Sequence, residues 1–117
     1  MTIERVLLVE DDVAIASGVA TLLELEGIHV RVVETGRDVA RITAAFRPDA
    51  LVLDLSLPDV DGIVVYREVR RAFPSLAIII SSGTLDGDTP SDAGRTAYLQ
   101  KPYEFATLLA TLRKLTV

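Results

Sequence analysis

The stretch Ala50-Leu51-Val52-Leu53-Asp54 is an unbroken run of apolar residues that ends in a carboxylate. A strand with no polar alternation is typical of a parallel sheet that is covered on both faces. Pro48, two residues earlier, closes the preceding segment of helical spacing, because proline disrupts a helix interior. We therefore expect residues 50–54 to form a central strand.

Short apolar runs recur on both sides of this stretch, separated by longer segments with helical spacing. The pattern predicts strands at residues 6–9, 28–33, 50–54, 76–80 and 97–99, and helices at residues 13–26, 36–46, 63–73 and 103–115. His29 and Arg31 alternate with valines, which indicates an edge strand. The alternation of strands and helices predicts an α/β fold around a mostly parallel sheet.

Apolar residues at helical spacing mark the face of each predicted helix that should be buried. They are Ile15, Val19, Leu22 and Leu23 in the first helix, Val39, Ile42 and Phe46 in the second, Val65, Val69, Ala72 and Phe73 in the third, and Phe105, Leu108, Leu109, Leu112 and Leu115 in the last. In contrast, residues 83–94 include Gly87 and Pro90 among polar side chains. We expect a loop or a frayed turn there, with no full helix.

Composition narrows the class of protein. A chain of 117 residues that is 50% hydrophobic and 25% charged is expected to form one globular domain over residues 1–117. Its net charge of -5 disfavours direct binding of nucleic acid. The first residues resemble neither a signal peptide nor a membrane span, so we expect a cytoplasmic protein that does not bind membranes. With no cysteine and a single histidine, His29, the chemistry must use carboxylates, hydroxyls and lysine.

Polar groups follow the predicted strands at the end where a parallel sheet binds ligands. Glu10-Asp11-Asp12 follows the first strand, Asp54 ends the third, Ser81-Ser82-Gly83 ends the fourth, and Lys101-Pro102 follows the fifth. Carboxylates held close together repel one another unless a cation lies among them. Oxygen ligands without Cys or His favour Mg²⁺, or Mn²⁺.

Such an edge can hold a phosphoryl group. Asp54 would be the attacking carboxylate, the metal and Lys101 would each take one phosphoryl oxygen, and the Ser82 hydroxyl would take the third.

Five motif blocks in this order resemble the receiver domain of two-component response regulators (CheY-like). They are Val9-Glu10-Asp11-Asp12, Asp54 with Pro58 and Asp61-Gly62, Ser82-Gly83, and Tyr98-Leu99-Gln100 followed by Lys101-Pro102. The resemblance covers nearly the whole chain. It implies the doubly wound, flavodoxin-like sheet of order 2-1-3-4-5, the order for which a chemotaxis receiver is a standard example.

The resemblance also implies a role for each matching residue. Asp54 is the phosphoacceptor, Asp11 a direct Mg²⁺ ligand, and Glu10 an acid that acts on the metal through water. Ser56 lends its backbone carbonyl to the metal. Ser82 is the switch hydroxyl, Tyr98 the switch aromatic and Lys101 the phosphate-binding lysine, and the Lys101-Pro102 bond is expected to be cis.

One stretch departs from the family. Between Ser82 and Lys101 the chain is a few residues shorter than usual, where receivers carry a helix between the fourth and fifth strands. That helix forms part of the family's output face. We therefore expect it to be shortened or disordered, and the usual docking or dimer surface to be altered.

Each of these residues also has a simpler interpretation. Asp54 is compatible with a turn cap. The acids that follow the first strand are compatible with the N-terminus of the first helix, and Asp12 is assigned only to that capping role. Lys101 and Tyr98 are compatible with surface and packing positions. Ser81 competes with Ser82 for the switch role, and the small Gly83 that follows favours Ser82.

Three functions compete. The first is a signalling domain, not an enzyme, that accepts a phosphoryl group from a histidine kinase or a histidine phosphotransfer protein, assists its own phosphorylation and dephosphorylation, and switches binding to a downstream protein effector. It would be a monomer or a phosphorylation-dependent dimer, either stand-alone or part of a hybrid kinase or larger regulator. The second is an Mg²⁺-dependent aspartyl phosphatase, disfavoured because the acceptor lies in strand three and Ser56 replaces the second aspartate. The third is a receiver fold that has lost phosphorylation, disfavoured because every motif residue is present.

Overall fold

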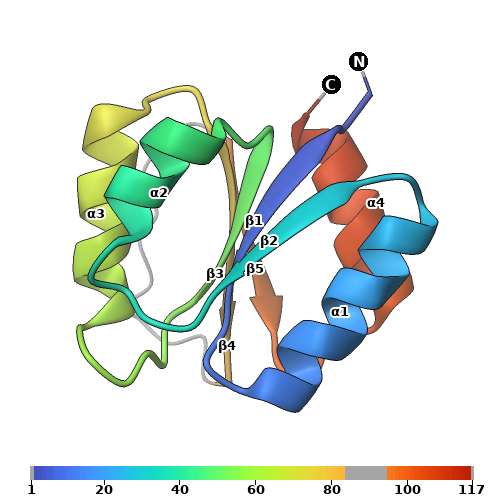
Figure 1. The fold of residues 1–117 in the computed structure, drawn as a ribbon, viewed down its shortest axis with the longest axis horizontal. Coiled ribbons are helices and arrows are strands. Elements are labelled where there is room, and N and C mark those ends of the chain that lie inside the picture. Colours follow the sequence, from blue (N-terminus) through green and yellow to red (C-terminus); the bar gives the residue numbers. More distant parts are fainter. Residues whose placement is uncertain (1, 84–94, 117) are drawn as a thin grey trace.

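The computed structural model describes residues 2–83 and 95–116, which form a parallel sheet of five strands with helices on both faces (Figure 1). The strands are β1 (Arg5–Val9), β2 (His29–Val33), β3 (Ala50–Asp54), β4 (Ala77–Ser82) and β5 (Thr96–Gln100). The helices in this part of the chain are α1 (Val13–Leu25), α2 (Val39–Phe46), α3 (Gly62–Ala72) and α4 (Phe105–Leu115).

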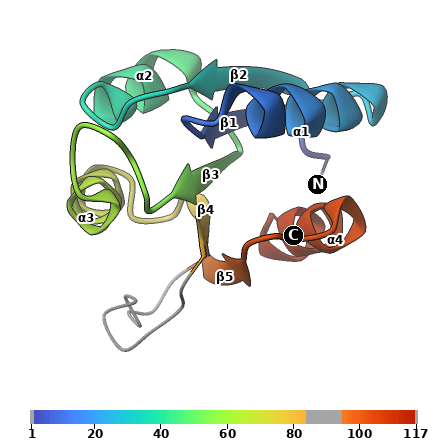
Figure 2. The same cartoon turned by 90° about the horizontal axis from the view of Figure 1, so that it is seen from below.

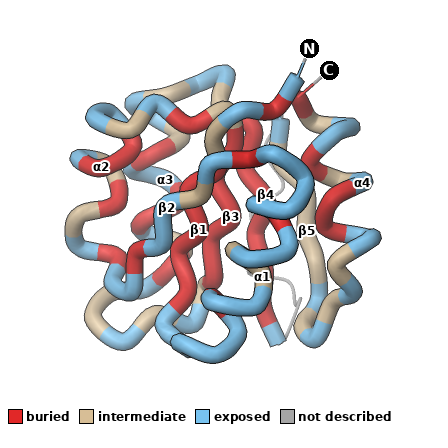
Figure 3. The backbone as a smooth tube through the Cα atoms, turned by 45° about the vertical axis from the view of Figure 1, so that its right-hand side comes forward, coloured by how far each residue is buried: buried red, intermediate tan, exposed pale blue. Residues whose placement is uncertain are grey.

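The strand order is β2-β1-β3-β4-β5, and all four pairings are parallel. The predicted fold class, strand order and edge position of residues 28–33 are therefore confirmed. β3 and β4 are buried along their whole length, because each pairs with a strand on both sides and is covered on both faces. Figure 3 shows β1, β3 and β4 as the buried strands, with many exposed positions on the helices around them.

The sheet divides the apolar interior into two clusters, one on each face. α1 and α4 cover one face, where Ala16, Leu23 and Leu108 pack against Val52 and Ile79. α2 and α3 cover the other, as the end-on view in Figure 2 shows. Side chains of a strand alternate between the two clusters, which is why β1, β3 and β4 are apolar along most of their length.

The prediction for the buried face of α1 is partly wrong. Asp12 caps the helix by accepting the backbone N–H of Ile15 at 3.1 Å, as the sequence suggested. Ile15 and Leu22, however, are 41% and 42% exposed. Ala16 and Leu23 are the buried residues, with Val19 partly buried beside them, so the contact stripe is narrower than the apolar face of the helix.

In the other helices, the apolar residues predicted to face the core are buried or partly buried, except in α3. Val65 and Val69 are buried as expected, but Ala72 is exposed and Tyr66, which was not predicted, is fully buried. The hydroxyl of Tyr66 lies 3.0 Å from that of Thr96 in β5, so this tyrosine has a polar partner at the end of its apolar ring.

The prediction of a loop over residues 83–94, and of a shortened helix there, concerns positions 84–94, which lie outside the described residues. Within residues 2–83 and 95–116, none of the helices has the length and hydrophobicity needed to cross a membrane.

Candidate functional site

Four strands deliver the predicted site residues to one edge of the sheet. Glu10 follows β1, Asp54 is the last residue of β3, Ser82 is the last residue of β4, and Lys101 follows β5. In a parallel sheet all the carboxyl ends lie at the same edge, so residues far apart in the sequence become neighbours.

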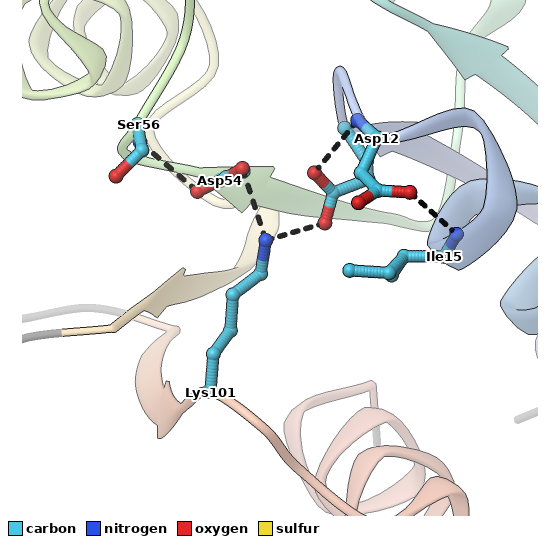
Figure 4. Close-up of polar contacts among 6 residues, drawn as sticks. Asp12, Ile15, Asp54, Ser56 and Lys101 are labelled. Carbon is cyan, nitrogen blue, oxygen red and sulfur yellow. Dashed lines mark hydrogen bonds and ion pairs between the residues drawn. The ribbon is translucent and has the colours of Figure 1, made fainter.

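Lys101 connects the acids of β1 and β3 (Figure 4). Its ammonium Nζ donates to Glu10 Oε1 at 2.5 Å and to Asp54 Oδ2 at 3.0 Å. Both carboxylate side chains are only 3% exposed, and that of Lys101 is 21% exposed. Buried charges in proteins are paired, and here one cation serves two anions.

Asp11 completes an acidic cluster at this edge. Carboxylate oxygens of Glu10, Asp11 and Asp54 all lie within 4.8 Å of one another. Asp11 is exposed, so the cluster opens to solvent on its side. Three carboxylates with one ammonium carry a net negative charge, and an all-oxygen donor set suits a hard divalent cation. The residues present therefore fit Mg²⁺.

The electrostatics of the pair follow from burial. Burial raises the pKa of Glu10 above its usual 4.5, and although the hydrogen bond from Lys101 opposes the shift, the neighbouring Asp54 reinforces it. Burial alone would lower the pKa of Lys101, but its hydrogen bonds to Glu10 and Asp54 outweigh burial and raise the pKa above its usual 10.5. Lys101 is therefore a cation at neutral pH.

The backbone after β3 fixes the orientation of Asp54. The N–H of Ser56 donates to Asp54 Oδ1 at 2.9 Å (Figure 4), which leaves Oδ2 for Lys101. The N–H of Leu55 donates to the carbonyl of Ser81 at 3.0 Å, so the chain leaves β3 along β4. Ser56 thus lies beside the carboxylate of Asp54, where its carbonyl was predicted to serve a metal.

Ser82 and Tyr98, the predicted switch residues, lie on β4 and β5. The carbonyl of Ser82 accepts the N–H of Lys101 at 2.8 Å, which joins the ends of these two strands. Ser82 is 6% exposed. Tyr98 packs against the core cluster on the α2 and α3 face. Ser81 also lies beside the site, because it is the register partner of Asp54. The assignment of the switch role to Ser82 rather than to Ser81 therefore stays a prediction.

Tyr103 is a neighbour of the site that the sequence reasoning missed. Burial, and then the charge of Glu10, raise the pKa of its phenol above the usual 10.0. Its position directly after Lys101-Pro102 was the signal that could have found it. The Lys101-Pro102 peptide bond is cis, as the resemblance implied.

A five-stranded sheet of order 2-1-3-4-5 with an acidic cluster and a lysine at its carboxyl edge defines the class of receiver-like domains. The model of the response regulator receiver domain matches residues 6–113. The chain therefore belongs to the response-regulator receiver family, whose members act in two-component phosphorelay signalling.

Individual relatives agree with this assignment. The response regulator MprA of Mycolicibacterium vanbaalenii is 34% identical over 114 residues, which are 95% of this chain and 49% of the relative. The transcriptional regulatory protein TrcR of Mycobacterium tuberculosis is 37% identical over 114 residues, 95% of this chain and 44% of the relative. The chain thus spans about half the length of these two relatives.

Solved structures share the fold over nearly the whole chain. A CheY-like receiver domain protein from Methanospirillum hungatei has a TM-score of 0.85 at 26% identity and covers 97% of this chain and 94% of its own. The BeF3-activated N-terminal receiver domain of Klebsiella pneumoniae RstA has a TM-score of 0.84 at 27% identity and covers 97% and 98%.

Proposed function

We propose that Asp54 accepts a phosphoryl group from the phosphohistidine of a histidine kinase or a histidine phosphotransfer protein. The carboxylate of Asp54 attacks phosphorus, a P–O bond forms, and the P–N bond breaks with its electron pair returning to the imidazole of the donor. The observation that carries this proposal is the ammonium of Lys101, which bonds to Asp54 Oδ2 beside a cluster of three carboxylates.

The metal would be held by Asp11 and Asp54 directly, by Glu10 through water, and by the backbone carbonyl of Ser56. Mg²⁺ or Mn²⁺, when bound, supplies positive charge to the phosphoryl oxygens and screens the carboxylates from one another. Lys101 is already beside the acceptor oxygen, so it needs only a small movement to follow a phosphoryl group. Ser82 would bind a third oxygen, and Tyr98 would respond from β5.

In this proposal the chain is a signalling domain that assists its own phosphorylation and dephosphorylation, and not an enzyme acting on a separate substrate. The phosphorylated form would bind a downstream protein effector, as a monomer or as a phosphorylation-dependent dimer, in the cytoplasm and without direct contact with nucleic acid. The position of Asp54 in β3, with Ser56 two residues later, argues against an aspartyl phosphatase.

The test is the intact mass of the protein after incubation with acetyl phosphate, with and without Mg²⁺. We expect one phosphoryl adduct that needs Mg²⁺ and is lost in Asp54→Ala. Asp49→Ala is the matched control, because Asp49 lies at the amino ends of the strands, directly before β3. This variant should retain the adduct.

If no adduct forms in folded protein, beryllofluoride separates two explanations. Binding of beryllofluoride would indicate a competent site that hydrolyses the acyl phosphate quickly. Absence of both the adduct and beryllofluoride binding would contradict the proposal and favour a receiver fold without phosphorylation.

A further inference from the structure

The carboxylate of Asp59 connects two loops at the carboxyl edge of the sheet through two hydrogen bonds. It lies in the loop of residues 55–61, between β3 and α3. Its Oδ1 accepts the N–H of Gly36 at 2.8 Å, and its Oδ2 accepts the N–H of Arg37 at 2.9 Å. Gly36 and Arg37 belong to the loop between β2 and α2. The side chain of Asp59 is 14% exposed, with the guanidinium Nε of Arg37 3.9 Å away.

The two loops also fit together through apolar contact. A side chain on Gly36 would collide with Val60, Val65 and Leu57. The backbone of the β2–α2 loop therefore packs against the 55–61 loop and α3 at a distance that only glycine permits. Asp59 therefore bonds to a backbone whose position is already restricted by packing.

The base of the 55–61 loop is held independently. The N–H of Leu55 donates to the carbonyl of Ser81 at 3.0 Å, and the N–H of Gly62 donates to the carbonyl of Leu55 at 3.3 Å. A Cβ on Gly62 would collide with the backbone of Leu55. Ser56 lies between the hydrogen bonds at the base of the loop and the Asp59 contact at its tip. Both sets of contacts therefore restrict the position of the Ser56 carbonyl.

We propose that Asp59 is a positioning residue for the metal site, acting through the 55–61 loop on the carbonyl of Ser56. This inference rests on the proposed function, in which that carbonyl is a metal ligand. A loop held in its binding geometry before the metal arrives loses less conformational entropy on binding, which raises affinity. Residues that orient metal ligands without touching the metal commonly change affinity about 10-fold or more when they are removed.

Asp49 provides a control with the same chemistry at the other edge of the sheet. Its Oδ2 accepts the N–H groups of Glu4 and Arg5 at 2.7 and 2.9 Å, where β1 and β3 begin. Removing Asp49 deletes the same number of backbone hydrogen bonds as removing Asp59. It leaves the carboxyl edge untouched.

The experiment is calorimetric titration with Mg²⁺ of the parent chain, Asp59→Ala, Asp59→Asn and Asp49→Ala, each with its melting temperature. We expect Asp59→Ala to raise the Kd about 10-fold. Asp59→Asn retains one carbonyl oxygen and should fall between this variant and the parent. Asp49→Ala should lower the melting temperature while its Kd stays within about twofold of the parent.

A second readout follows the amides themselves. In the parent, addition of Mg²⁺ should shift the amide resonances of Gly36 and Arg37, and in Asp59→Ala it should not. The inference is overturned if folded Asp59→Ala binds Mg²⁺ as tightly as the parent, or if Asp49→Ala weakens binding to the same extent. If the parent itself binds no Mg²⁺, the metal part of the proposed function fails, which is a distinguishable result.

Discussion

Lys101 is the one residue in the described site whose removal leaves two buried carboxylates facing each other. Glu10 and Asp54 are each 3% exposed and share its ammonium. Breaking a buried ion pair by deleting one partner is strongly destabilising, because the remaining charge keeps its desolvation cost. We predict that Lys101→Met lowers the free energy of unfolding by about 3 kcal/mol in metal-free buffer, measured by urea denaturation.

Asp54→Asn is the complementary variant for this prediction. It keeps the shape of the side chain and removes one negative charge, so that Lys101 and Glu10 remain as a single pair. This variant should be at least as stable as the parent under the same conditions. Equal stability of Lys101→Met and the parent would show that the ammonium does not compensate the buried acids.

The carboxyl of Asp59 gives a second prediction, concerning pH. Hydrogen bonds from Gly36 and then Arg37 hold the pKa of Asp59 below its usual 3.8, although burial opposes this shift. The folded state therefore binds fewer protons than the unfolded chain, and the stabilisation is present above the unfolded pKa and is lost as pH falls through the folded one. We predict that Asp59→Asn is less stable than the parent near neutral pH and that the difference narrows on acidification.

Urea denaturation in metal-free buffer, at a series of pH values from about 6 to about 3, checks this prediction. A difference in unfolding free energy that stays constant over this range would mean that the pKa of Asp59 is the same in the folded and unfolded states.

At the scale of a single element, two helical glycines should respond to alanine with opposite signs. Gly18 lies within α1 with no atom within 4 Å of the position of a Cβ, so Gly18→Ala should stabilise the chain by about 0.5–1 kcal/mol through helix propensity. Gly62 begins α3, where a Cβ would collide with the backbone of Leu55. Gly62→Ala should destabilise by about 2 kcal/mol.

Denaturant unfolding of both variants tests this pair. If Gly62→Ala were stabilising like Gly18→Ala, the close approach of the 55–61 loop to α3 would not constrain the fold.

The helices show what the sequence could predict and what it could not. Periodicity located all four described helices, and it identified the buried stripe of α4 because Leu108, Leu109 and Leu112 are spaced for one face. It overestimated the width of the buried face of α1, where Ile15 and Leu22 are apolar but lie outside the narrow contact with the sheet. It missed Tyr66, because a tyrosine is buried only where its hydroxyl finds a partner, and Thr96 lies 30 positions away.

The site was predictable for a different reason. The carboxyl ends of parallel strands all lie at one edge, so the residues at the end of each apolar run are expected to be neighbours. Glu10, Asp54 and Lys101 are in contact there, as expected. The contact of Asp59 with the β2–α2 loop could not be predicted, because it depends on how two loops approach each other and not on strand order. The sequence neighbourhood of Asp59 after Pro58 gives no signal for it.

At the scale of the whole molecule, a metal ion bound at the acidic cluster would couple metal binding to folding. A ligand that binds only the folded state stabilises it by mass action, by about 1.4 kcal/mol at ten times its Kd. We predict that millimolar Mg²⁺ raises the melting temperature by several degrees over NaCl of equal ionic strength, and that Asp11→Asn reduces the shift. A melting temperature indifferent to Mg²⁺ would count against a metal at Glu10, Asp11 and Asp54.

The bond between Lys101 and Glu10 joins residues 91 positions apart, which has a consequence for synthesis on the ribosome. The acids of β1 and β3 can meet as soon as those strands pair, whereas the ammonium reaches them only after β5 has been made and has added to β4. A contact of long sequence separation costs loop-closure entropy before it stabilises the fold. A nascent chain therefore carries the concentrated negative charge of Glu10, Asp11 and Asp54 before Lys101 has been synthesised to compensate it.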